Sequence, residues 1–178
     1  AYQPSSGPAV EFKLSFKQRD EEDTAWIDGQ SVLGSGWNCN WLSYIDGSSI
    51  QPGFSSYVGV ALPGGGSSIY MTDPSDNTAP PDYFTHYSFK VILDVNNNIT
   101  SLQLIAPDGS KLAYGYQNPS AGGNAGLFFL TGVIDSQGRQ LTLAYTSDNS
   151  SYVHLSTVTD LDGNVVTLHY DNGSFPDM

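Results

Sequence analysis

A repeat in the second half of this sequence constrains the fold more than any other feature. Residues 130–145 align on residues 155–170 without a gap, at an offset of 25. Each copy places an Asp, and three positions later a Gly, between two stretches in which apolar residues recur at every second position. A period of two is typical of a β-strand with one buried face, and Asp-x-x-Gly is typical of a turn that reverses such a strand. Each copy is therefore predicted to be one β-hairpin.

The residue types in the repeat have separate roles in such a hairpin. An Asp side chain can cap the backbone amides that follow it, and a Gly supplies the left-handed residue that closes the turn. Each return strand ends at a tyrosine, Tyr145 or Tyr170, whose ring can pack while its hydroxyl reaches a partner. A weaker copy centres on Gly109. The predicted structural turn residues are Asp108, Gly109, Asp135, Gly138, Asp160 and Gly163.

The rest of the chain reads as further strands between Gly- and Pro-rich turns. About eleven are predicted, at residues 10–17, 36–45, 56–62, 67–72, 83–95, 99–106, 111–116, 127–134, 140–146, 152–159 and 165–170. Residues 10–17 should form a half-buried strand, whose apolar face lies in the core and whose polar face meets solvent. Trp37 and Trp41 should lie in the core with Cys39. Residues 73–82 read as a loop. The predicted fold is all-β: an extended, twisted antiparallel sheet of stacked β-hairpins, either an open barrel or a sandwich. It forms one domain over residues 1–178, with pre-repeat strands in 1–72 and hairpin repeats in 83–178.

Composition excludes several classes of protein. With 19 Gly, 10 Pro and few helix formers, the chain is not a helical bundle. The formal net charge of −12 argues against nucleic acid and anionic membranes as partners, because both need cationic stripes. One cysteine, Cys39, cannot form an internal disulfide, and no apolar run is long enough to span a bilayer. The acidic, lysine-poor composition favours a secreted or surface location.

The repeat resembles the units of the RHS/YD-repeat proteins. The second copy carries Asp160-Leu-Asp162-Gly163-Asn164 and ends in Tyr170-Asp171. Three segments of the first half, residues 8–17, 33–37 and 41–45, resemble the region ahead of the repeats in bacterial members. Residues 60–65 and 106–110 resemble the family's Pro-Asp-Gly turns. The resemblance covers nearly the whole chain.

The resemblance implies an architecture rather than a reaction. Long members of the family wind many hairpins into a hollow shell that encloses a toxin or effector, and others sit on cell surfaces in adhesion and contact roles. This chain departs from the pattern, since Tyr145 is followed by Thr146 and the self-cleaving aspartate motif of toxin-delivering members is absent. It therefore looks like the amino-terminal region with the first repeats, or a stand-alone relative, secreted or at a bacterial cell surface.

Candidate chemical groups have simpler explanations in the predicted fold. His86, His154 and His169 show no metal-ligand spacing, although the last two flank one hairpin. Asp160-Leu-Asp162-Gly163-Asn164 begins like a calcium loop but lacks the distal glutamate. The aspartates that would serve a glycosidase are already accounted for by turns. No catalytic residue, metal site or cofactor is predicted.

The leading functional prediction is a structural or interaction module that contacts protein or glycan surfaces. Self-association through the edge from Val165 to Tyr170 is one form of this contact, because an unprotected strand edge can pair with another chain. Two alternatives stay open. One is a small secreted hydrolase acting on polysaccharide or ester, and the other is a carbohydrate-binding module. For the latter, Trp26, beside an acidic loop, is the candidate glycan-contact aromatic.

Overall fold

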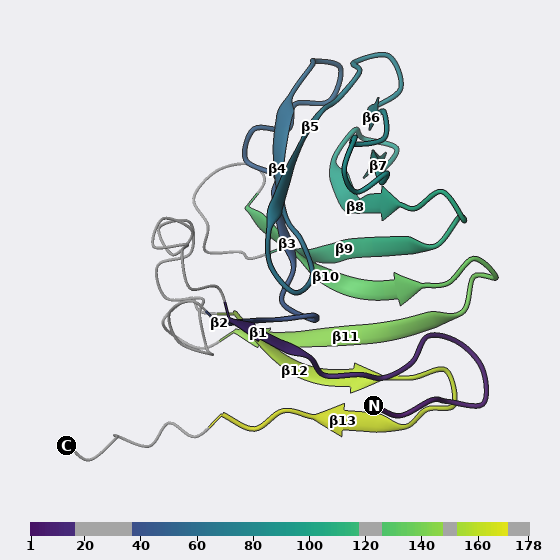
Figure 1. Ribbon diagram of the computed structural model, residues 1–178. Helices are drawn as coiled ribbons and strands as arrows, with labels where there is room; N and C mark the ends of the chain where they lie inside the picture. The colour runs from purple at the N-terminus through teal and green to yellow at the C-terminus, as the bar shows by residue number, and fades with distance from the viewer. Residues whose placement is uncertain (17–36, 118–125, 148–152, 171–178) are drawn as a thin grey trace.

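The computed structural model describes residues 1–16, 37–117, 126–147 and 153–170 (Figure 1). These residues form thirteen strands and contain no helix. The strands are β1 (Leu14–Phe16), β2 (Trp37–Cys39), β3 (Tyr44–Asp46), β4 (Tyr57–Ala61), β5 (Ser67–Met71), β6 (Thr78–Ala79), β7 (Ser88–Leu93), β8 (Ile99–Ile105), β9 (Lys111–Gln117), β10 (Leu127–Ile134), β11 (Gln140–Ser147), β12 (Val153–Thr159) and β13 (Val165–Thr167).

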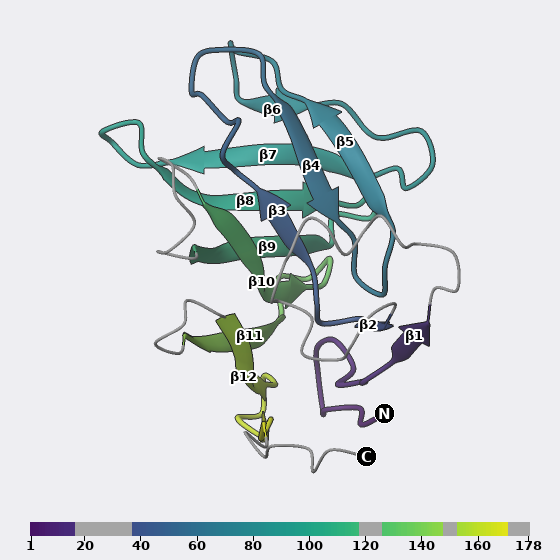
Figure 2. The ribbon, with the colours of Figure 1, turned by 90° about the vertical axis from the view of Figure 1, so that its left-hand side faces the viewer.

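Eleven of these strands form one antiparallel sheet, which confirms the predicted all-β class. From β6 to β13 every strand pairs with its sequence neighbours, and β3, β4 and β5 join this meander through β10. The sheet curls into an open, nearly barrel-shaped body in which β3–β5 cross β7–β9 at a steep angle (Figures 1 and 2). β1 and β2 form a separate two-stranded sheet.

A fork in the sheet lies at β10. The first half of β10 pairs with β3 at residues 127–129, and its second half pairs with β11 at residues 132–134. Leu130 lies between these two pairings. Its N–H donates to the carbonyl oxygen of Ser43 at 3.0 Å, and its carbonyl oxygen accepts a hydrogen bond from the Tyr145 hydroxyl at 2.7 Å. Both backbone groups of Leu130 are therefore satisfied where the neighbouring strands diverge.

The hydrophobic core lies between β3–β5 and β7–β10. Tyr70 of β5 stacks on Phe89 of β7 with ring centroids 5.6 Å apart. Tyr114 of β9 is fully buried, and its hydroxyl lies 2.8 Å from the hydroxyl of Ser43. Burial raises the pKa of Tyr114 well above its usual range. These contacts join parts of the chain that are far apart in sequence.

The first predicted strand is wrong in both length and burial. Only Leu14–Phe16 are paired as a strand, and Phe12, Leu14 and Phe16 are each about half exposed. The physical reason is that β1 pairs with β2 and joins no larger sheet, so no core covers its apolar side. The rings of this segment form local pairs instead: the centroid of Phe16 lies 5.1 Å from that of Trp37, and the centroid of Phe12 lies 5.2 Å from that of Trp41.

The predicted strand at residues 36–45 is also wrong, because a turn at residues 40–43 divides it into β2 and β3. The chain must turn there because β2 pairs with β1 whereas β3 pairs with β4 and β10. Trp41 and Cys39 are buried as predicted, but Trp37 is 44% exposed.

Three other predicted elements differ from the structure. The predicted strand 83–95 begins at Ser88, because the Asp82 carboxylate accepts hydrogen bonds from the N–H groups of Phe84 and Thr85 and holds a turn. The predicted loop 73–82 contains the short strand β6. The last predicted strand stops at Thr167.

Candidate functional site

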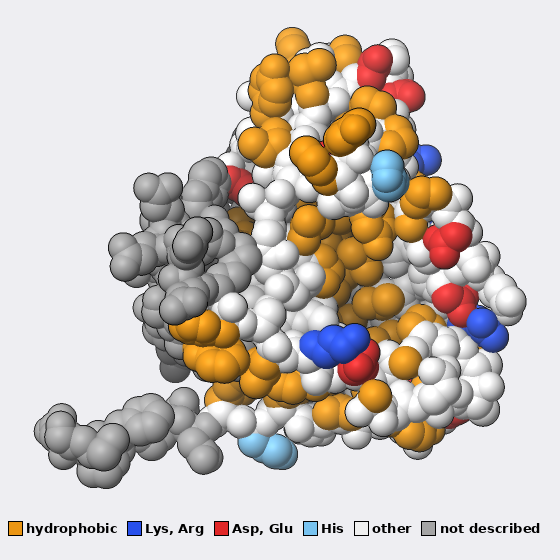
Figure 3. Space-filling view, in the orientation of Figure 1, with side chains coloured by type: hydrophobic (Ala, Val, Ile, Leu, Met, Phe, Trp, Pro, Cys, Tyr) orange, Lys and Arg blue, Asp and Glu red, His pale blue; other side chains and the backbone are white. Residues whose placement is uncertain are grey.

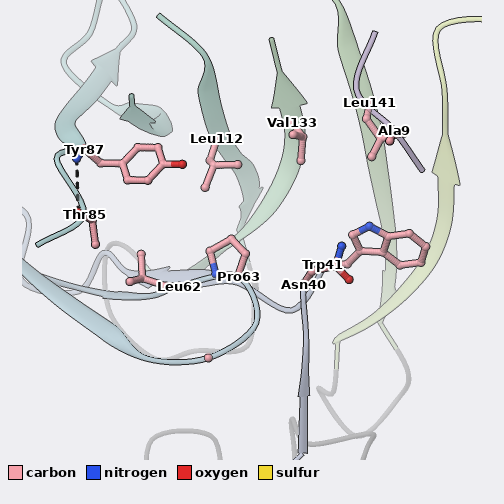
Figure 4. A pocket seen from close by; sticks show the side chains of 11 residues that line it. Ala9, Asn40, Trp41, Leu62, Pro63, Thr85, Tyr87, Leu112, Val133 and Leu141 are labelled. Atoms are coloured by element: carbon pink, nitrogen blue, oxygen red, sulfur yellow. Dashed lines mark hydrogen bonds between the residues drawn. The ribbon is translucent and has the colours of Figure 1, made fainter. Parts of the chain in front are cut away.

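The described residues form a hollow of about 400 Å³. Its floor is one face of the sheet, which carries Leu112, Val133 and Leu141, and Tyr87 lines the hollow from the segment just before β7. The β4–β5 turn, with Leu62 and Pro63, and the β2–β3 turn, with Asn40 and Trp41, form the walls (Figure 4). The hollow opens to solvent, and hydrophobic side chains gather in it (Figure 3). Its volume lies in the lower part of the range typical of small-molecule pockets.

The fork at β10 creates this hollow. Because β3 follows the first half of β10 and β11 follows the second half, β3–β5 rise away from the plane of β11. The β4–β5 turn then stands over the sheet instead of lying in it (Figure 1). In this turn the Leu62 N–H donates to the Gly66 carbonyl oxygen at 2.9 Å, and Gly64 and Gly65 have φ of 77° and 103°. The glycines supply left-handed residues that hold the tip in this shape.

Two aromatic side chains lie at opposite ends of the hollow, Tyr87 at one end and Trp41 at the other (Figure 4). Trp41 is 5% exposed, and one side of its ring packs on Phe12. Within the described part of the chain, neither the indole N–H nor the Tyr87 hydroxyl has a hydrogen-bond partner. Each of these groups is therefore free to bond to something in the hollow.

Asn40 and the N-terminal segment complete the walls. The Asn40 side chain accepts a hydrogen bond from the Lys13 N–H at 2.8 Å and donates to the Glu11 carbonyl oxygen at 2.6 Å. At the other end of the segment, the Ser5 N–H donates to the Asp162 carboxylate at 2.7 Å. These anchors hold Ala9, between them, against the hollow.

The lining does not resemble a catalytic centre. None of the described residues that line the hollow is charged, and His86, His154 and His169 lie elsewhere. No group of three or more His, Cys, Asp or Glu side chains with metal-binding geometry occurs in the described ranges. The described residues also contain no helix that could cross a membrane.

The predicted turn residues lie in hairpin turns of one design. Residues 94–98, 106–110, 135–139 and 160–164 each close with a pair of hydrogen bonds between the same relative backbone positions. Gly138 and Gly163 have φ of 83° and Gly109 has φ of 84°, in the left-handed region that the prediction assigns to the first two. In the turn at residues 94–98, Asn97 holds the same place, with φ of 63°. Sequence reasoning did not align that turn with the others, because Asn stands where they carry Gly.

The aspartates of these turns are capping groups. Asp135 Oδ1 accepts hydrogen bonds from the N–H groups of Gln137 and Arg139 at 2.9 and 3.0 Å, and its Oδ2 from Arg139 Nε at 2.7 Å. Asp160 accepts from the backbone N–H and the side-chain amide of Asn164 at 2.8 and 2.9 Å. The second copy thus replaces a charged partner with a neutral one in the same place.

Hydrogen bonds also change the acidity of two of the turn aspartates, Asp108 and Asp135. The Ser110 hydroxyl, followed by the Ser110 N–H, lowers the pKa of Asp108. For Asp135, burial raises the pKa, but the hydrogen bonds from Arg139 outweigh it and the pKa falls. The carboxylates of Asp108 and Asp135 are therefore held in their charged form, which suits a cap and does not suit a general acid at neutral pH.

The remaining predicted sites are distributed as follows. The turns that carry Asp108, Asp135 and Asp160 lie along the same side of the sheet, one after every second strand (Figure 1). His154 packs against Tyr170 with ring centroids 5.1 Å apart, and His169 is exposed. Trp26 lies outside the described residues. The most exposed aromatic pair that is described is Tyr83 and Phe84, at 82% and 85%.

Sequence reasoning missed the hollow. Its lining comes from strands and turns far apart in the chain, so no local pattern marks it. No protein-family model and no curated protein sequence matches the chain.

Proposed function

We propose that this chain is a structural and interaction module of stacked β-hairpins, similar to the start of an RHS/YD-repeat shell and secreted or exposed at a bacterial cell surface. The observation that carries the proposal is the agreement between the two repeat copies at the level of single contacts. The Tyr145 hydroxyl donates to the carbonyl oxygen of Leu130 at 2.7 Å, and the Tyr170 hydroxyl donates to that of Leu155 at 2.8 Å. Both pairs are 15 residues apart, and the pairs are related by the 25-residue offset.

An array of such hairpins grows by adding strands at its edge. β13 is the last strand on its side of the sheet among the described residues, and its Val165 and Val166 are 55% and 42% exposed. In the ladder between β12 and β13, hydrogen-bonded residue pairs alternate with pairs that are not hydrogen-bonded. The bonds from Leu168 N–H to Ser156 O and from Asp160 N–H to Asn164 O show which pairs are the hydrogen-bonded ones. In an antiparallel ladder this alternation turns the backbone groups of Val165 and Thr167 away from β12.

This edge offers two residues with outward N–H and C=O groups and no charged side chain within the strand. An edge of this kind is a template for pairing with another strand. We infer that it receives either a further strand of the same array or the edge of a second molecule.

Sedimentation or light scattering over a wide range of protein concentration tests the proposal. We expect reversible association that Thr167→Pro abolishes, because proline removes an outward N–H and leaves the internal ladder intact. Thr167→Ser is the matched control and should associate like the wild type. A protein that stays monomeric at high concentration, or association that is unaffected by Thr167→Pro, contradicts the proposal.

A further inference from the structure

We propose that the hollow between the β4–β5 turn and the face of β9–β11 is a binding site for a small, neutral, largely apolar molecule that carries a hydrogen-bond acceptor. This site is separate from the β13 edge and does not depend on the function proposed above.

The first argument is the character of the lining. Leu62 and Pro63 face Leu112, Val133 and Leu141 across the opening, so an occupant contacts aliphatic surface on two sides. Burial of apolar surface on binding is favourable and grows with the area removed from water. Among the described residues, no charged side chain lines the space to compensate for the desolvation of an ionic ligand, and the net charge of −12 further disfavours an anion.

The second argument is the pair of unpartnered polar groups. Trp41 is 5% exposed, and its indole nitrogen, which can only donate, is not among the fully buried atoms and has no partner among the described residues. The Tyr87 hydroxyl on the opposite side points toward the space between them (Figure 4). A ligand that presents a carbonyl or ether oxygen satisfies such a group, whereas a hydrocarbon leaves both groups without a partner.

The third argument is that the walls are held in place without a ligand. Both polar ends of the Asn40 side chain are already bonded to the N-terminal segment, and three of the floor residues lie on paired strands. A site whose shape is fixed before binding loses little conformational entropy when it is filled.

A neutral fluorescent ketone, 6-propionyl-2-dimethylaminonaphthalene, is a suitable probe, because its emission shifts to the blue in apolar surroundings. We expect saturable binding to the folded chain with a dissociation constant of about 10–100 µM, as suits a ligand of this size. The anionic dye 1-anilinonaphthalene-8-sulfonate, also a naphthalene, should bind more weakly. Absence of saturable binding, or tighter binding of the anionic dye, overturns the proposal.

Variants locate the probe. Val133→Phe fills the hollow and should weaken binding at least about tenfold, whereas Thr142→Phe, on the opposite face of the same sheet, should not change it. If Val133→Phe unfolds the protein, Leu62→Phe fills the same space from the β4–β5 turn. Equal affinities for the filled and control variants overturn the assignment to this hollow.

A further pair of variants tests the hydrogen bond. Tyr87→Phe removes a hydroxyl and leaves the ring, so we expect a loss of affinity of about twofold to tenfold. Tyr83→Phe removes a hydroxyl from an exposed ring outside the hollow and should have no effect. If Tyr87→Phe binds the probe as tightly as the wild type, this hydroxyl does not contact the ligand.

Discussion

The hydroxyl of Tyr145 donates a hydrogen bond of 2.7 Å to the carbonyl oxygen of Leu130, at the point where β3 and β11 part from β10. Without this bond the carbonyl oxygen would face the gap between two diverging strands. The ring of Tyr145 packs against Phe129 and Tyr116, with centroids 5.4 and 5.3 Å away. One side chain therefore covers the fork and satisfies its backbone, which gives a physical reason for a tyrosine at the end of the repeat.

Removing this hydroxyl should destabilise the fold. We expect Tyr145→Phe to lower the free energy of unfolding by about 1–2 kcal/mol, because it leaves a buried carbonyl oxygen without a partner. Tyr170→Phe should lower it by less, because Tyr170 is 36% exposed and water can replace its hydroxyl. Urea denaturation measures both effects. Tyr83→Phe serves as the control and should stay within about 0.5 kcal/mol of the wild type. Equal stability of Tyr145→Phe and this control would remove the proposed role of the hydroxyl.

The left-handed turn residues should tolerate asparagine better than valine. Gly138 and Gly163 have open space where a Cβ would lie, so any loss of stability comes from backbone strain alone. Gly163→Val should cost about 1–2 kcal/mol, and Gly163→Asn clearly less, since Asn97 already adopts this conformation in a sister turn. Thermal unfolding measures the difference. Gly59→Ala, at an open strand position without positive φ, should be neutral or slightly stabilising. A valine variant as stable as the asparagine variant contradicts the turn argument.

Alkaline pH should weaken the fold through its buried tyrosines. Burial raises the pKa of Tyr114 and of Tyr145 above the usual value near 10. The unfolded chain therefore releases these protons at a lower pH than the folded chain, so stability is fully present below about pH 10 and is lost as pH rises further. Urea midpoints measured between pH 8 and pH 11 should fall, and less steeply in Tyr145→Phe than in Tyr83→Phe. Parallel slopes in the two variants would contradict the assignment.

Low pH should also weaken the fold, through the aspartates that cap its turns. Hydrogen bonds from Asn98 and Ser110 lower the pKa of Asp94 and of Asp108. The stability that these caps contribute is present above the unfolded pKa near 3.9, and it is lost as pH falls through the lower folded values. Asparagine at both positions keeps a capping oxygen and cannot titrate. The double variant should therefore lose less stability than the wild type between pH 5 and pH 2, as measured by urea midpoints. An equal loss would show that other groups control acid unfolding.

The second half of the fold was predictable because its contacts are local. The predicted strand 127–134 coincides with β10, and strands 99–106, 111–116 and 140–146 each agree with β8, β9 or β11 to within one residue at either end. Each of these strands pairs with its neighbour in sequence, and the turn residues that set the register lie between them. Alternation and turn chemistry are sufficient in such a segment.

The first half was predicted less well because its pairing is remote. β3 pairs with β10 across more than 80 residues, and only that pairing explains why the chain must turn between Cys39 and Tyr44. Alternation at residues 10–16 indicates a strand, but alternation does not reveal that β2 is the only described strand with which β1 pairs. Phe12, Leu14 and Phe16 are exposed for that reason.

By itself the sequence determined the hairpins of the repeat: the left-handed glycines Gly138 and Gly163, the capping aspartates, and a tyrosine at the end of each copy. These features depend on groups no more than about 15 residues apart, so local order is enough to place them. The tertiary structure alone decided that β10 shares one edge between β3 and β11, and that Trp41 and Tyr87 line one hollow from opposite ends. Such arrangements arise from the packing of segments that are distant in sequence. Which strands become neighbours depends on packing across the whole sheet and not on any short stretch of residues.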